Sequence, residues 1–224
     1  MSNTTIVTPG LKNRPGGLDT RSRRRALLLL LMFCAGLLGL TYSDHWLWAH
    51  LKVSDVPGLE RREWYQFFRQ LGTLYIWIAA AAMLIAYDFK RAANPITRGA
   101  MLFLSAGLGG GAAELLKILI HRLRPGETGE YLFRSTIEQL SAPEAESLRK
   151  LGFGLASSHT GVAFGGAFML ARLFPRTAPV AIALASGCAL TRLLTGAHFA
   201  TDVYVAMGMS YAVAAALWRF NPRH

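Results

Sequence analysis

Three short polar clusters interrupt the apolar stretches of this chain, each where an apolar stretch meets a loop. They consist of Lys117 with Arg124, the run Ser157-Ser158-His159, and Arg192 with His198 and Asp202. Cations and imidazoles at the ends of apolar helices must be solvated, paired or bound to an anion. Cations, histidines, a carboxylate and hydroxyls together therefore indicate chemistry on an anionic group.

Each cluster, taken alone, has a simpler interpretation. His198 and Asp202 are four residues apart and could form an ordinary histidine–carboxylate pair on one helix face. Lys117 and Arg124 could be interfacial cations that reach towards lipid phosphates. Ser157 could be a helix cap. A shared site requires that the three clusters meet in space.

The composition places these clusters in a membrane protein. Of the 224 residues, 52% are hydrophobic and only 17% are charged, and the mean hydropathy is +0.30. This is too apolar for an ordinary soluble domain of the same length. The net charge of +11 does not indicate a nucleic-acid partner, because the basic residues lie at the ends of apolar runs rather than in one stripe with aromatic residues.

The apolar runs predict an all-α, polytopic membrane protein with six transmembrane helices. Each run approaches the roughly 20 residues that cross a hydrocarbon core. We place the spans at about 26–42, 70–87, 99–120, 158–174, 178–195 and 202–218. They predict a single six-helix domain over residues 26–220, preceded by a disordered basic arm over residues 1–25, which we expect in the cytoplasm.

The arrangement of Lys and Arg predicts the orientation of these spans. The run Arg23-Arg24-Arg25 directly precedes the first span, and such residues favour the cytoplasmic side. Six crossings from a cytoplasmic start leave both termini in the cytoplasm and bring all three clusters to the outer face. We therefore expect an integral protein of a bacterial inner membrane with its site on the periplasmic side.

Other segments give weaker expectations. The aromatic residues of 43–69 predict a helix that lies in the membrane interface, and charges within the loop 122–157 predict a short surface helix. Glu114 is spaced to pair with Lys117 on one helix. Glycines near 107–111 predict close helix packing, and Cys34 and Cys188 are expected to be small packing residues.

The three clusters, in order and spacing, resemble the signature of the type 2 phosphatidic acid phosphatase superfamily. The resemblance covers roughly residues 99–218, and the six-helix layout is similar too. Two of its three differences are an alanine and a serine, Ala156 and Ser158, where that family usually has proline and glycine. The third is a threonine, Thr191, in place of serine. A glycine is often used where backbone approaches a ligand closely, so Ser158 narrows the pocket or adds a phosphate donor.

The resemblance implies a lipid phosphate phosphatase that needs no metal and no cofactor. His198 would attack phosphorus to form a phosphohistidine, Asp202 would hold its imidazole, and His159 would protonate the leaving oxygen. The phosphoryl group would be bound by Lys117, Arg124, Ser157, Ser158 and Arg192. The expected partners are the bilayer and a membrane lipid carrying a phosphomonoester or pyrophosphate. A phosphotransferase with the same site, and a non-catalytic binder or translocase of lipid phosphates, stay open as alternatives.

Overall fold

The computed structural model describes residues 20–126, 128–135 and 152–221, and every regular element within them is a helix. The all-α prediction is therefore confirmed for this part of the chain. The expected arm lies largely outside the described residues, and so does the surface helix expected within the loop 122–157. The chain divides into two compact units, Met1–Gly36 and Leu37–His224, and the site lies in the second.

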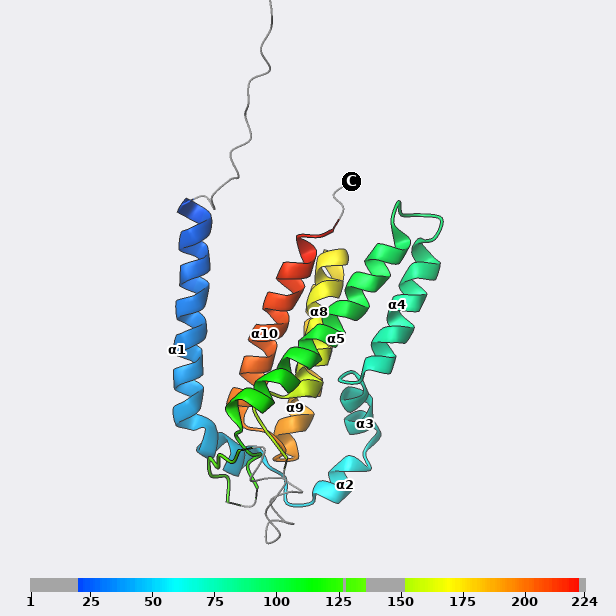
Figure 1. The fold of residues 1–224 in the computed structure, drawn as a ribbon. Coiled ribbons are helices and arrows are strands. Elements are labelled where there is room, and N and C mark those ends of the chain that lie inside the picture. Colours follow the sequence, from blue (N-terminus) through cyan, green and yellow to red (C-terminus); the bar gives the residue numbers. More distant parts are fainter. Residues whose placement is uncertain (1–19, 127, 136–151, 222–224) are drawn as a thin grey trace, which may run out of the picture. The chain divides into compact units, whose positions relative to one another are not determined.

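Helix boundaries follow the predicted spans closely, except at the first. The helices are α1 Thr20–Leu51, α2 Val56–Glu60, α3 Glu63–Gln70, α4 Leu74–Asp88, α5 Pro95–Ile120, α8 Ser158–Leu173, α9 Ala178–Leu194 and α10 Ala200–Trp218, with a 3₁₀ turn at Pro175–Thr177 (Figure 1). The first predicted span, 26–42, lies within a longer helix that runs from Thr20 to Leu51. This helix continues through Asp44, whose carboxylate is buried and paired rather than exposed in a loop.

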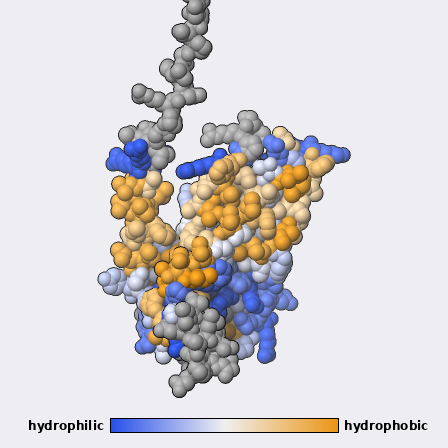
Figure 2. Space-filling model, viewed as in Figure 1, coloured by the Kyte–Doolittle hydropathy of each residue, from blue (hydrophilic) through white to orange (hydrophobic). Residues whose placement is uncertain are grey.

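Four of the described helices are long and apolar enough to cross a membrane: α1, α5, α9 with its preceding turn, and α10. The pair α3 and α4, bent by 67° at its break, would make a fifth. Helix α8 has 16 residues, fewer than the roughly 20 that cross a hydrocarbon core. Six crossings are therefore not confirmed by these lengths. Apolar side chains cover the exposed middle of the helices, as expected where lipid surrounds them (Figure 2).

The most buried helix is α8, which packs against α5, α9 and α10. Small residues let it approach α5 closely, because a Cβ added at Gly165 would lie 2.3 Å from the carbonyl oxygen of Ser105. Two serines add hydrogen bonds to α8: Ser105 donates to the Gly165 carbonyl at 2.6 Å, and Ser210 of α10 donates to the Gly161 carbonyl at 2.8 Å. Close backbones joined by hydroxyls are typical of helices packed within a membrane.

The close approach of α5 and α8 predicts opposite outcomes for two neighbouring glycines. A Cβ at Gly109 would lie 2.5 Å from the Gly161 carbonyl oxygen, whereas a Cβ at Gly111 would meet nothing within 4 Å. We expect Gly109→Ala to lower the free energy of unfolding by about 1–3 kcal/mol, the usual cost of overpacking. Gly111→Ala should leave it unchanged or slightly raised, because alanine favours the helix. Thermal unfolding in detergent compares them, and equal midpoints would contradict the packing described here.

Candidate functional site

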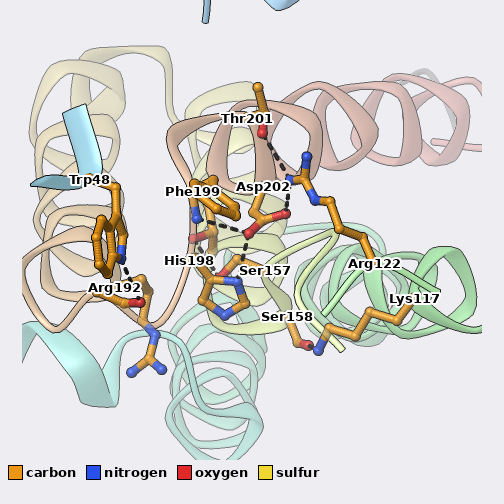
Figure 3. Close-up of polar contacts among 12 residues, drawn as sticks. Trp48, Lys117, Arg122, Ser157, Ser158, Arg192, His198, Phe199, Thr201 and Asp202 are labelled. Atoms are coloured by element: carbon orange, nitrogen blue, oxygen red, sulfur yellow. Dashed lines mark hydrogen bonds and ion pairs between the residues drawn. The ribbon is translucent and has the colours of Figure 1, made fainter. Parts of the chain in front are cut away.

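The three predicted clusters meet at one end of the helices of the second unit (Figure 3). Lys117 comes from the last turn of α5, Ser158 from the first turn of α8, and Arg192 from the last turn of α9. His198 precedes α10, and Asp202 lies in its first turn. Residues separated by up to about 85 positions in the sequence thus lie at the same end of the helices, and the three clusters make up one candidate site.

The carboxylate of Asp202 holds His198. Its Oδ2 lies 3.3 Å from His198 Nδ1 and accepts the Phe199 amide at 2.9 Å. Both side chains are buried. An ionised carboxylate can only accept hydrogen bonds, so Nδ1 carries the proton and the neutral ring presents Nε2 as its free lone pair. The i, i+4 pairing expected from the sequence is confirmed.

Arg122 is a member of the site that the sequence analysis missed. Its Nη2 lies 2.5 Å from Asp202 Oδ1, and it also donates to the hydroxyl of Thr201 at 2.9 Å. The guanidinium stacks over the rings of Tyr131 and Phe199. Arg122 is buried, so this ion pair is shielded from solvent and holds the Asp202 carboxylate from the side opposite His198. In the sequence, only its position two residues before Arg124 indicates that Arg122 could belong to the site.

Asp44 of α1 is a second buried carboxylate that the sequence analysis missed. It accepts hydrogen bonds from the Thr201 amide at 3.0 Å and from the Thr201 hydroxyl. Tyr131 donates to it at 2.6 Å, and burial together with this carboxylate raises the pKa of Tyr131 to about 12. Asp44 and Asp202 both accept amides at the start of α10, where the helix dipole favours negative charge.

Arginines at the site, Arg122 among them, leave Nε donors without a hydrogen-bond partner among the described residues. Arg192 is buried, and the Nε atoms of Arg192 and Arg124 are shielded from solvent without a hydrogen-bond partner among the described residues. Buried N–H donors without partners are costly, and a bound anion would accept hydrogen bonds from those of Arg124 and Arg192. Arg124 and Arg192 also lie near enough to His198 for their charges to act on it.

Burial sets the protonation of His198. It lowers the pKa of the imidazole by disfavouring the charged form, and the positive charges of Arg192 and Arg124 lower it further. The hydrogen bond and negative charge of Asp202 act in the opposite direction, but the net shift is downward. The free site therefore holds His198 as the neutral ring, which is the nucleophilic form.

Lys117 and Ser158 are in contact, and both bind Glu114. The Lys117 Nζ lies 2.5 Å from the Ser158 hydroxyl and 2.8 Å from Glu114 Oε1. The pairing of Glu114 with Lys117 expected from their spacing is therefore present. Ser158 in turn donates to the same Glu114 oxygen.

The start of α8 contributes backbone donors and the second histidine. Ser157 occupies the N-cap position, but its side chain makes no capping hydrogen bond, and its hydroxyl accepts from Thr160 at 3.1 Å instead. The simple capping role is thus not observed, and the positive end of the helix faces the site. The charges of Arg192, His198 and Arg69 act on His159. Arg69 of α3 is a further nearby cation that the sequence analysis missed.

A short segment after α5 holds Arg124 of the first cluster and Arg122 in place. His121 ends α5 in a left-handed conformation with φ of 58°. The Leu123 amide then donates to the Leu132 carbonyl at 2.7 Å, and the Arg124 amide donates to the Gly152 carbonyl at 3.1 Å. These bonds hold the backbone of Arg122 and Arg124 against two separate parts of the following loop.

Comparison with known proteins gives one match. The family model of the PAP2 superfamily matches residues 98–224, which include all eight site residues expected from the sequence. No curated protein and no solved structure matches the chain significantly. The matched range begins in α5, so α1 to α4, with Asp44 and Arg69, lie before it.

Arg122 and His198 both contact the Asp202 carboxylate. Removing the charge of Arg122 should therefore change the pKa of His198. In Arg122→Gln, the carboxylate loses its cation, and protonating His198 becomes the nearest way to neutralise it. We expect the pKa of His198 to rise. Arg122→Lys, which keeps a positive charge, should raise it less. NMR titration of ¹⁵N-labelled histidines in the full-length protein measures both, and an unchanged or lower pKa in Arg122→Gln would contradict this coupling.

Proposed function

The chain belongs to the PAP2 superfamily, whose members are phosphatases, and from this premise we propose that it hydrolyses a phosphomonoester or pyrophosphate carried by a membrane lipid. The observation that carries the proposal is the buried Asp202–His198 pair beside guanidinium groups with unused donors. A nucleophile held by a carboxylate next to an anion site suits phosphoryl transfer.

The proposed reaction proceeds through a phosphohistidine. The Nε2 lone pair of His198 attacks phosphorus, the nitrogen–phosphorus bond forms, and the bond from phosphorus to the lipid oxygen breaks. The leaving oxygen takes a proton from His159. Water then attacks the phosphohistidine, His159 accepts the proton of that water, and the nitrogen–phosphorus bond breaks to release phosphate. Both histidines return to their starting forms, so the cycle balances.

The cations supply the charge stabilisation that this reaction needs. Hydrolysis of phosphate monoesters without a catalyst is so slow that enzymes accelerate it by up to about 10²¹-fold. Lys117, Arg124 and Arg192 would surround the phosphoryl oxygens, with bidentate contacts from the arginines. The start of α8 would add amide donors from Ser158 onwards, and Ser157 would add its hydroxyl. In the proposed mechanism these groups act without a metal or cofactor.

An apolar groove supports a lipid substrate. It has a volume of about 470 Å³ and runs along α9 and α10, the helices whose ends bear Arg192 and Asp202. Leu193, Ala200 and Met207 are among its lining residues. A lipid whose chain followed this groove could keep its phosphate at the polar end of the helices. We further propose that the helices cross the membrane six times, with the termini in the cytoplasm and the site on the outer face.

The proposed roles predict the activity of two histidine variants. Purified protein should release phosphate from at least one lipid in a panel of phosphatidic acid, phosphatidylglycerol phosphate and isoprenyl pyrophosphate. His198→Ala should abolish the release, because no phosphohistidine can form. His159→Ala should slow it by about 10²- to 10⁴-fold, the usual contribution of a general acid. The exposed His50 provides a matched control, and His50→Ala should keep full activity.

The same assay decides the alternatives. Phosphate release that persists in both His198→Ala and His159→Ala would disprove this mechanism, and release abolished by a chelator would disprove its metal-free form. Transfer of the phosphoryl group to an added lipid, without free phosphate, would indicate a phosphotransferase instead.

The lowered pKa of His198 predicts the acidic side of the pH profile. The neutral ring is the nucleophile, so activity falls as the pH drops through its pKa. Because burial lowers that pKa, we expect the acidic decline of kcat/KM below the ordinary histidine value of about 6.5. An acidic decline centred above 6.5 would contradict the role given to His198.

A further inference from the structure

In the free site, Glu114 binds two of the side chains that we propose to bind phosphate, Lys117 and Ser158. Its carboxylate accepts from Lys117 Nζ at 2.8 Å and from the hydroxyl of Ser158. The Lys117 Nζ also lies 2.5 Å from the Ser158 hydroxyl, so the three side chains form a closed triangle. The side chain of Lys117 is only 9% exposed, whereas that of Glu114 is 59% exposed. The carboxylate therefore covers the lysine from the open side.

A carboxylate at this place competes with a phosphoryl group in two ways. Each of its oxygens is an acceptor, as a phosphoryl oxygen is, and uses the same donors. It also carries a negative charge that repels a phosphate dianion within a few ångströms. The Ser158 hydroxyl has a single hydrogen to donate, so it cannot donate to both anions, and a phosphoryl group bound to Lys117 would lie beside a second negative charge.

We propose that Glu114 is a specificity-determining residue, a resident anion that must leave Lys117 and Ser158 before a phosphoryl group binds. The inference rests on the proposed function only in taking these two side chains as part of the phosphoryl site. Displacing Glu114 lowers the affinity for every phosphoanion. A lipid phosphate gains additional binding energy from its chain and still binds, whereas free phosphate at the same concentration stays out. Release of the phosphate product is favoured for the same reason.

Ser158 makes this arrangement possible. Glycine at this position, as in the motif that the chain resembles, has no hydroxyl to bridge the lysine and the carboxylate. Ser158 receives a hydrogen bond from Lys117 and gives one to Glu114, so it holds the two on the same side of the site. In the free enzyme it is therefore a positioning residue for Glu114.

Binding of inorganic phosphate to the full-length protein in detergent tests the proposal without any turnover. Isothermal titration calorimetry at fixed ionic strength should show that Glu114→Gln binds phosphate about three- to tenfold more tightly than the parent protein, in line with partly exposed ion pairs. The control is Glu130→Gln, which removes one negative charge from an exposed position in the loop after α5 and should change the affinity less than twofold. Unchanged or weaker binding by Glu114→Gln would overturn the proposal, and so would equal tightening by both variants.

A second variant separates the two roles open to Ser158, and its effect in the parent protein tests the proposal even if Glu114→Gln does not fold. If Ser158 acts by holding Glu114, Ser158→Ala should tighten phosphate binding about two- to threefold in the parent protein. It should have no such effect when combined with Glu114→Gln. Weaker binding in both backgrounds would mean that Ser158 only donates to phosphate, and would overturn its positioning role. Lipid phosphate hydrolysis, measured in parallel, judges the proposed function separately from this result.

Discussion

The buried carboxylate of Asp202 is the group on which the site depends. Its two oxygens bind Arg122, His198 and the Phe199 amide, and its backbone carbonyl accepts the Ser157 amide at 3.2 Å. One residue thereby joins the segment after α5, the start of α8 and the start of α10. A buried charge is tolerated only when it is fully paired and hydrogen-bonded. The need to satisfy Asp202 therefore fixes the relative positions of all three clusters.

Asp44 is a second buried carboxylate that joins separate segments, and it lies before residues 98–224, which the family model matches. Its carboxylate binds Thr201, and Thr201 also accepts from Arg122. The end of α1 reaches the α9–α10 connection as well, where Trp48 donates to the Gly196 carbonyl at 3.3 Å and the Val53 amide donates to the Leu194 carbonyl at 2.9 Å. These contacts hold the backbone on both sides of His198. The residues that position the nucleophile thus come from outside the matched range as well as from within it.

Local spacing allowed some of these contacts to be predicted and not others. The pairs Glu114–Lys117 and His198–Asp202 lie three and four residues apart on helices, and both are present. Arg122–Asp202 and Asp44–Thr201 join residues 80 and 157 positions apart, and no periodicity indicates such pairs. The charge of Asp44 gave no sign of its buried position within α1. Burial with three hydrogen bonds lets the helix continue through it.

The helix boundaries also divide into those that apolar sequence length predicts and those that depend on tertiary packing. Apolar length located α5, α8, α9 and α10 to within a few residues. It did not indicate the 67° bend between α3 and α4, where a Cβ at Gly72 would lie 2.7 Å from His159 Cβ. At this point the backbone of the chain passes against the second histidine of the site. The break in the helix thus lies where the chain packs against the first turn of α8.

The composition of α8 connects the membrane fold to the chemistry. The helix must begin at the depth of the nucleophile, between α5, α9 and α10, and only small residues let it fit there. At Gly109 and Gly161 the backbones of α5 and α8 approach so closely that neither position has room for a methyl group. The same approach brings Lys117 and Ser158, 41 positions apart, within hydrogen-bonding distance. The glycines that let α8 approach α5 closely thus allow its first turn to take part in the anion site.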